Sequence, residues 1–287
     1  EITCRDWSSD VCSSDLVVII VSSFALWEYY KLAEKKGSYP IKFLGLSSNI
    51  ILIITIFLYL VNSNLSWLWV VILIELYLIM IIVIFVELIS IKRNPVFNIA
   101  ITFSGLFYIT SSMIAIIGIR EIYFIASMLN AQLNQVSFAI SYNTLFGARE
   151  HFGTYMLIIM FFSIWLCDAL AYFVGKGIGK HKLYPRVSPK KSWEGGIAGL
   201  VGSIICFAVF SNLFIPGFPL LHSLVLGFLV GTIGQVGDFG ESLLKRDAGV
   251  KDSSSILPGH GGFLDRFDSV FFAAPALFIY LILLILI

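Results

Sequence analysis

The chain has 287 residues, of which 58% are hydrophobic and 13% are charged, and its formal net charge is +1. Runs of about 20 mainly apolar residues match the thickness of a bilayer core and are too long and too apolar for a soluble domain to hide. Their backbone must be helical, because lipid offers it no hydrogen-bonding partner. The sequence therefore predicts an all-α, polytopic integral membrane protein, and no nucleic-acid partner is expected.

Eight apolar spans follow one another along the chain. They are expected at about Leu16–Ala33, Phe43–Val61, Trp67–Ile89, Val96–Ile119, Thr154–Val174, Trp193–Phe214, Leu220–Leu244 and Phe267–Ile287. The basic connections, at 34–36, 92–93, 176–191 and 245–266, then all fall on one side of the membrane, whereas 62–66 and 211–219 carry no Lys or Arg. The positive-inside rule places the basic side in the cytoplasm.

Three regions are expected. Residues 1–16 form a non-native segment, because Asp6–Leu16 reads like the translation of a widely used sequencing adapter, and the first helix is then truncated. A short polar tail is the alternative. Residues 17–153 form the N-terminal membrane helices and a non-cytoplasmic loop, and 154–287 form the catalytic membrane region. Within the loop, 120–153 is interpreted as an interfacial amphipathic helix, with a re-entrant or extra short span as the alternative.

Carboxylates gather near the cytoplasmic ends of the later spans. They are Asp168, Asp238, Glu241, Asp265 and Asp268. Three helices can direct these acids into one shallow cavity that opens to the cytoplasm. Clustered carboxylates repel one another unless a cation lies between them, and Mg²⁺ usually takes one or two carboxylates together with substrate phosphates. A divalent metal site is predicted; the alternative is that each acid pairs with a cation, for example Asp265 with Arg266 or Asp238 with Lys245.

Other polar groups inside the spans are assigned no chemistry. Glu75 and Glu87 are interpreted as interhelical hydrogen-bonding groups or interface residues. The cysteines show neither a disulfide framework nor metal-ligand spacing.

Two polar loops have the composition of an anion site. In the first, residues 259–262 (GHGG) let backbone N–H groups approach a phosphate just before a helix, although a plain flexible turn is the alternative. Fixed positive charge surrounds this tetrapeptide, at Lys245, Arg246, Lys251 and Arg266. The second loop, 175–196, ends with Ser192 as a predicted helix N-cap and Glu194 in the first turn, and helix N-termini bind anions. Both loops fall on the cytoplasmic side and could hold a polyanion; a solvated loop is the alternative reading of the second.

These residues resemble the phosphatidate cytidylyltransferase (CDP-diacylglycerol synthase) family. The pattern of that family is met at Ser242, Lys245, Arg246, Lys251, Asp252, His260, Gly261, Gly262, Asp265, Arg266 and Asp268. A second block of the family looks like Asp168–Tyr172, Gly175-Lys176, 188–195 and Gly237-Asp238. The tight resemblance covers about 165–275, with Leu170 where relatives usually carry Gly. The first half of the chain matches only in hydropathy and in Leu26–Tyr30.

The resemblance implies an enzyme of phospholipid biosynthesis that transfers the cytidylyl group of CTP to phosphatidate, giving CDP-diacylglycerol and pyrophosphate. It implies a Mg²⁺-dependent nucleotidyltransferase of the bacterial inner (plasma) membrane, with its active site facing the cytoplasm and an apolar groove that admits the acyl tails. The implied catalytic residues are Lys245, Arg246, Lys251, His260 and Arg266. The implied phosphate-binding residues are Ser188, Lys191, Ser192, Gly261 and Gly262. Asp238 and Asp265 are the implied metal ligands, with Asp168 and Asp268 as outer supports; a second metal ion and a homodimer stay open.

Two rival functions stay open. A CTP-dependent polyprenol or dolichol kinase would pass the γ-phosphate to a membrane lipid, but the sequence pattern disfavours it. An ion-coupled transporter could use Asp168, Asp238 and Glu241 as a relay. Transporters favour sites near the membrane midplane and repeated halves, and the sequence indicates neither.

Overall fold

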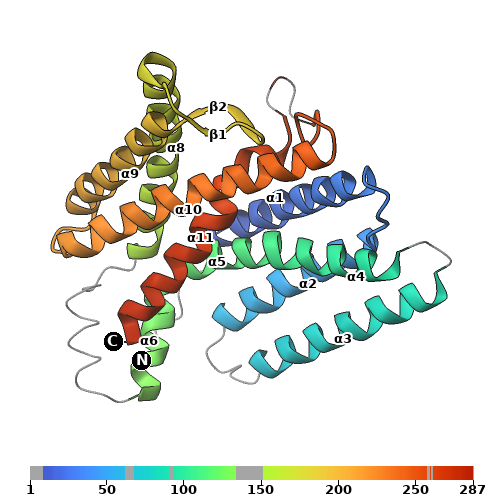
Figure 1. Cartoon of the computed structure of the whole chain (residues 1–287). Helices are drawn as coiled ribbons and strands as arrows, with labels where there is room; N and C mark the ends of the chain where they lie inside the picture. The colour runs from blue at the N-terminus through green and yellow to red at the C-terminus, as the bar shows by residue number, and fades with distance from the viewer. Residues whose placement is uncertain are drawn as a thin grey trace. The chain divides into compact units, whose positions relative to one another are not determined.

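The computed structural model describes residues 9–61, 68–90, 94–133, 151–256, 259 and 261–286, and within them the chain is almost entirely helical (Figure 1). Its elements are α1 (Ser9–Glu34), α2 (Lys42–Val61), α3 (Leu68–Ile89), α4 (Pro95–Gly105), the π-helical turn η1 (Leu106–Thr110), α5 (Ser111–Arg120), α6 (Ile122–Leu133), α8 (Phe152–Ile178), β1 (Lys182–Tyr184), β2 (Ser188–Ser192), α9 (Trp193–Phe214), α10 (Leu220–Asp247) and α11 (Phe263–Leu286).

Eight helical segments of the described chain are long and apolar enough to cross a membrane, and each coincides with one of the predicted spans. The all-α polytopic fold is thereby confirmed. Several helices extend beyond the predicted spans at their polar ends: α1 begins at Ser9, α8 continues to Ile178 and α11 begins at Phe263. Hydropathy ends a span where charges begin, but backbone hydrogen bonds continue the helix beyond that point.

The chain forms two compact units. Unit 1 comprises Glu1–Ile117 and Asp252–Asp265, and unit 2 comprises Gly118–Lys251 and Arg266–Ile287. The polar segment 252–265 therefore clusters with the N-terminal helices. The three regions 1–16, 17–153 and 154–287 are divisions of the sequence and stay predictions.

Unit 1 has a polar interior among apolar helices. The buried hydroxyl of Tyr30 donates a hydrogen bond to the carbonyl of Thr102 at 2.9 Å. Asn49 accepts from Thr110 Oγ1 at 2.8 Å and donates to Ser22 Oγ at 2.9 Å. Hydrogen bonds of this kind join membrane helices, since lipid cannot replace them.

The two acids of α3 confirm the interhelical interpretation. Glu75 Oε1 accepts from Thr55 Oγ1 of α2 at 2.7 Å, and Glu87 Oε1 accepts from Asn98 Nδ2 of α4 at 2.6 Å. Both acids therefore join α3 to a neighbouring helix of unit 1.

Unit 2 is built on close helix contacts at glycines. A Cβ atom at Gly195 of α9 would lie 2.5 Å from the carbonyl oxygen of Ala171 in α8. A Cβ atom at Gly237 of α10 would lie 2.7 Å from the carbonyl oxygen of Asp268 in α11. Small residues allow helix backbones to approach in this way. Glycines thus pack α9 closely against α8, and α10 closely against α11.

A β-hairpin between α8 and α9 is a feature of the described part of unit 2 that the sequence does not predict (Figure 1). Strands β1 and β2 are antiparallel, with Lys182 opposite Ser192 and Tyr184 opposite Ser188. The hairpin is short and largely charged, so it lacks the alternation of apolar and polar residues that signals a strand. Its turn is anchored by Val187, which is buried.

The segment 120–153 is described only in part. Helix α6 covers its beginning, with Ile122 and Ala126 fully buried. Residues 134–150 lie outside the described residues, and the interfacial placement stays a prediction.

Candidate active site

Three predicted acids come together in unit 2. Asp168 of α8, Asp238 of α10 and Asp268 of α11 lie within electrostatic reach of one another and of Lys191. The side chain of Lys191 reaches from β2 and forms an ion pair with Asp238 Oδ2. Three carboxyl groups near one another thus share one ammonium group, which is the arrangement expected of a site that accepts further positive charge.

The partner of Asp238 differs from the alternative raised by the sequence. Lys245 does not pair with Asp238; its Nζ lies 2.6 Å from Glu241 Oε2, one turn earlier in α10. Glu241 is fully buried, so its charge depends on this lysine. Spacing within a helix favours the pair Glu241–Lys245. Lys191 reaches Asp238 from strand β2 of the hairpin, which the sequence does not predict.

The predicted N-cap of α9 is confirmed. Gly195 N donates to Ser192 Oγ at 3.2 Å, and Ser192 is buried. Glu194 in the first turn accepts from the Nδ1 atom of His181 at 2.7 Å. These contacts fix the end of β2, from which Lys191 projects.

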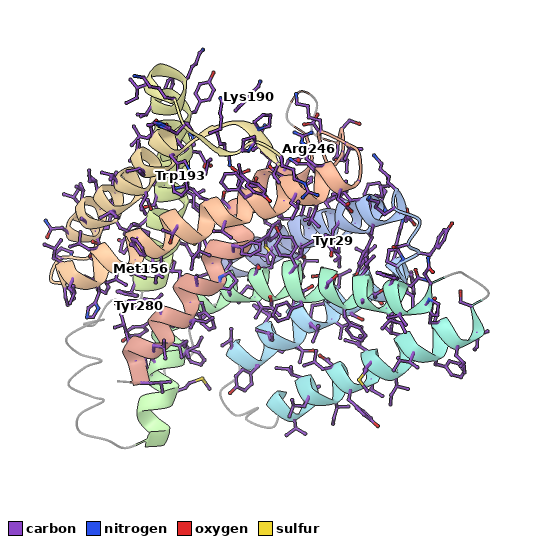
Figure 2. The ribbon with its side chains drawn as sticks, in the orientation of Figure 1. Tyr29, Met156, Lys190, Trp193, Arg246 and Tyr280 are labelled. Carbon is purple, nitrogen blue, oxygen red and sulfur yellow. The ribbon has the colours of Figure 1, made fainter. Side chains whose placement is uncertain are left out.

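Arg246 joins the end of α10 to the hairpin. Its Nε donates to the carbonyl of Val187 at 3.4 Å, and its Nη1 donates to the carbonyl of Val250 at 3.2 Å. Figure 2 shows Arg246 together with Lys190 of β2 and Trp193 of α9. Arg246 therefore ties the end of α10 to the turn between β1 and β2. Lys251 follows α10 and is exposed.

Asp265, a predicted metal ligand, organises backbone in unit 1. Its Oδ2 atom accepts from Gly262 N at 2.8 Å, from Ser253 N at 2.9 Å and from Ser253 Oγ at 2.8 Å. Gly261 has φ of 80°, and a Cβ atom there would lie 2.6 Å from the same oxygen. The glycine is therefore required both by its backbone conformation and by the nearby carboxylate. His260 lies outside the described residues.

Glu28 is a site residue that the sequence motifs do not single out. This fully buried acid of α1 accepts hydrogen bonds from Ser253 Oγ at 3.0 Å and from Leu264 N at 2.8 Å. The available signal was a lone acid inside an apolar span, within the short stretch Leu26–Tyr30 that resembles the family. An ionisable residue in a membrane helix is a functional candidate by default.

The donors present fit magnesium only in part. Within the described ranges, no three His, Cys, Asp or Glu side chains are grouped closely enough to hold a metal ion by themselves. The acids of unit 2 offer the hard oxygen atoms that Mg²⁺ prefers, and Asp238 already binds one cationic group. These residues fit an ion that is completed by substrate phosphate and water. The four metal assignments stay predictions.

Comparison with known proteins agrees with the resemblance. The sequence model of a family described as "Cytidylyltransferase family" matches residues 11–284. The chain belongs to this family. It is 42% identical over 130 residues to the phosphatidate cytidylyltransferase of Aquifex aeolicus (strain VF5), across 45% of this chain and 48% of that protein. It is 46% identical over 120 residues to the phosphatidate cytidylyltransferase of Bacillus subtilis (strain 168), across 42% of this chain and 45% of that protein.

A third relative, the phosphatidate cytidylyltransferase of Staphylococcus haemolyticus (strain JCSC1435), is 47% identical over 139 residues, across 48% of this chain and 53% of that protein. The chain thus spans about half the length of the curated relatives it matches. Family membership therefore rests on the match to the family's sequence model, which covers residues 11–284.

Proposed function

We propose that this chain transfers the cytidylyl group of CTP to phosphatidate, forming CDP-diacylglycerol and pyrophosphate in phospholipid biosynthesis. The observation that carries the proposal is the Lys191–Asp238 ion pair beside Asp168 and Asp268, at the polar ends of otherwise apolar helices. The names of the relatives support the choice of substrates. The basic connections support a cytoplasmic active site in a bacterial inner membrane.

The reaction needs charge control more than a strong base. A phosphate oxygen of phosphatidate attacks the α-phosphorus of CTP. The bond between that phosphorus and the bridging oxygen to the β-phosphorus breaks, and pyrophosphate leaves with the bonding electrons. The lipid phosphate is already anionic at neutral pH, so the main cost is the repulsion between two polyanions. Fixed cations and positioned donors reduce that cost.

Lys191 is the cation best placed to exchange partners. Its ammonium group contacts Asp238 and lies 4.4 Å from the centre of the Phe239 ring. The side chain of Lys191 is 33% exposed, so a substrate can reach it. A phosphate group would compete with Asp238 for this ammonium. The ion pair therefore keeps Lys191 extended over α10 until substrate binds, which lowers the entropy lost on binding.

The other proposed phosphate contacts come from both polar loops. They are Ser188, Ser192, Lys245, Arg246, Lys251, Gly261, Gly262 and Arg266, with His260 near the leaving group. When bound, Mg²⁺ would neutralise charge on the triphosphate, with Asp238 and Asp265 proposed to hold it and Asp168 and Asp268 as outer supports.

An apolar groove supports the lipid substrate. Its volume is about 510 Å³, and it is lined by residues that include Tyr184, Trp193, Ile197 and Phe239. Phe239 lies under the ammonium group of Lys191, so the groove begins beside the proposed phosphate contact. We propose that it receives part of an acyl chain while the lipid phosphate meets Lys191.

A two-label assay tests the function. Protein in detergent is given phosphatidate, Mg²⁺ and CTP labelled at either the α- or the γ-phosphorus, and label in the lipid phase is followed. The proposal expects only α-label in lipid. Label from only the γ-position would make the protein a lipid kinase instead. If label from neither position enters the lipid phase, the proposal is wrong, and an ion-coupled transporter becomes the better interpretation.

A further inference from the structure

Glu28 occupies a costly position. It lies on the apolar helix α1 of unit 1, and its side chain is fully buried. A buried carboxylate is stable only when donors surround it. The described donors all come from the polar segment 252–265, with Ser253 lying 225 residues further along the chain. Glu28 therefore joins the first helix to this segment.

Four donors divide evenly between the two carboxylate oxygens. Oε2 accepts from Ser253 Oγ at 3.0 Å and from Leu264 N at 2.8 Å. Oε1 accepts from Ser254 Oγ and from Phe263 N at 3.2 Å. Phe263 and Leu264 begin α11, so the carboxylate also lies at the positive end of that helix. One side chain thus fixes both ends of the segment.

Ser253 couples Glu28 to Asp265. Its Oγ atom lies 3.0 Å from Glu28 Oε2 and 2.8 Å from Asp265 Oδ2. A hydroxyl carries a single hydrogen, so it can donate fully to only one of the two carboxylates at a time. Any change at Glu28 alters what Ser253 offers to Asp265.

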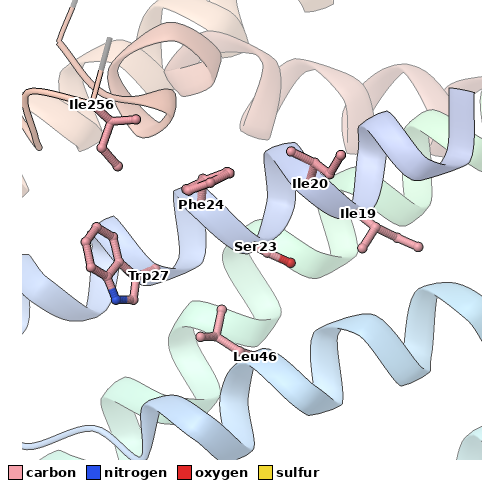
Figure 3. A pocket seen from close by; sticks show the side chains of 7 residues that line it. All are labelled: Ile19, Ile20, Ser23, Phe24, Trp27, Leu46 and Ile256. Atoms are coloured by element: carbon pink, nitrogen blue, oxygen red, sulfur yellow. The ribbon is translucent and has the colours of Figure 1, made fainter.

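Apolar packing encloses this contact. The rings of Phe24 and Phe263 are stacked, with centroids 5.1 Å apart. Ile256, in the same polar segment, faces Phe24 and Trp27 across a groove of about 570 Å³ (Figure 3). A Cβ atom at Gly262 would lie 2.3 Å from Glu28 Oε2, so only glycine allows this approach. Water is thereby kept from the carboxylate, which strengthens its hydrogen bonds.

We propose that Glu28 is a positioning residue for cytidylyl transfer, an inference that rests on the proposed function. Its buried carboxylate holds Ser253 and the start of α11 so that Asp265 is presented in one orientation. Residues that orient a ligand-bearing side chain typically change activity by about 10- to 100-fold when they are replaced. We expect a loss of that size in kcat when Glu28 no longer accepts all four hydrogen bonds.

Glu28→Gln is the sharpest variant, because it keeps the shape of the side chain. Each carboxylate oxygen accepts one backbone N–H group, so either orientation of the amide places an NH₂ group against a backbone donor. The matched control is Glu87→Gln. Glu87 is a buried acid of the same unit, and its Oε1 atom accepts from Asn98 Nδ2, a hydrogen bond that an amide oxygen can keep. The control should retain wild-type kcat.

Two readouts separate positioning from general stability. In Glu28→Gln, kcat per folded protein should fall about 10- to 100-fold with KM for CTP changed less than about threefold. In metal-free protein, amide hydrogen exchange of Ser253 and Leu264 should become faster, while the amides of α9 in unit 2 should not change. Loss of activity only in proportion to the folded fraction would overturn the proposal, and so would unchanged exchange.

A serine pair tests the coupling itself. The hydroxyl of Ser253 contacts the carboxylates of both Glu28 and Asp265, whereas the hydroxyl of Ser254 donates to Glu28. Ser253→Ala should therefore lower kcat more than Ser254→Ala does, and equal effects would contradict the coupling. If the wild-type protein transfers no label from CTP, the proposed function is wrong, but this result does not test the structural role of Glu28. The exchange comparison then still decides whether Glu28 orders the segment.

Discussion

Glu28 and Asp265 of unit 1 are stabilised in a different way from Asp238 and Glu241 of unit 2. In unit 1, Glu28 and Asp265 are surrounded by serine hydroxyls and backbone N–H groups, which cannot leave without unfolding the segment. In unit 2, Asp238 and Glu241 are each paired with a lysine, whose flexible side chain can exchange partners. Fixed donors suit acids that shape the backbone, whereas mobile cations suit acids that must respond to a charged substrate. Glu28 therefore differs from Asp238: its donors hold the backbone in place, whereas the lysine of Asp238 can turn to a substrate.

The largest effect is expected at Asp238. Asp238→Asn removes a charge that faces Lys191 and the other acids of unit 2, and we expect kcat to fall by about 10²–10³-fold in the CTP-label assay. Asp247→Asn, at the exposed end of the same helix, is the matched control and should keep near-normal turnover. Thermal unfolding of both variants should resemble wild type. Near-normal turnover of Asp238→Asn would show that the charge of Asp238 is not needed for the reaction.

The pair Glu241–Lys245 of α10 should affect stability, whereas Asp238 should affect activity. Lys245→Met leaves the buried charge of Glu241 without its lysine, which should reduce stability by about 3–5 kcal/mol. The double variant Glu241→Gln/Lys245→Met should regain much of that loss, because no charge is then buried. Thermal unfolding in detergent measures both changes. Equal stability of the single and double variants would show that the lysine does not compensate Glu241.

Lys191 should act mainly through the substrate. Lys191→Met should lower kcat/KM by about 100-fold, and Lys191→Arg should recover only part of it, because the planar guanidinium differs in geometry from an ammonium. Lys190→Met provides the control, since adjacent residues of a strand point to opposite faces. If Lys190→Met and Lys191→Met behave alike, the effect is one of general charge at the hairpin.

Local signals explain what the sequence could predict. Hydropathy located all eight spans, and the Ser192 cap followed from the residue type at the start of α9. The grouping of Asp168, Asp238 and Asp268 followed from their shared depth along three helices. The spans and the cap depend on residues close together in the chain, and the grouping of the acids depends on the depth of each acid along its own helix.

Contacts between distant segments could not be predicted in the same way. Glu28 meets Leu264 across 236 residues, and no periodicity indicates which polar loop a buried acid will contact. The Lys191–Asp238 pair needed the β-hairpin, whose charged strands carry no apolar alternation. Helix ends were also misplaced by a few residues, because charges terminate a hydropathy window before they terminate a helix.

The smallest effect concerns helix capping, where the two units again differ. Helix α9 of unit 2 is capped locally by Ser192, whereas the start of α11 in unit 1 is capped by Glu28 from a remote helix. Ser192→Ala removes the hydroxyl that accepts from Gly195 N and should lower the free energy of unfolding, measured by thermal unfolding, by about 1 kcal/mol. Glu28→Gln disturbs several hydrogen bonds at once and should cost more. If both variants lose the same free energy of unfolding, the remote cap of α11 stabilises the protein no more than an ordinary N-cap does. The lysine partners of Asp238 and Glu241 would then be the remaining difference between the two units.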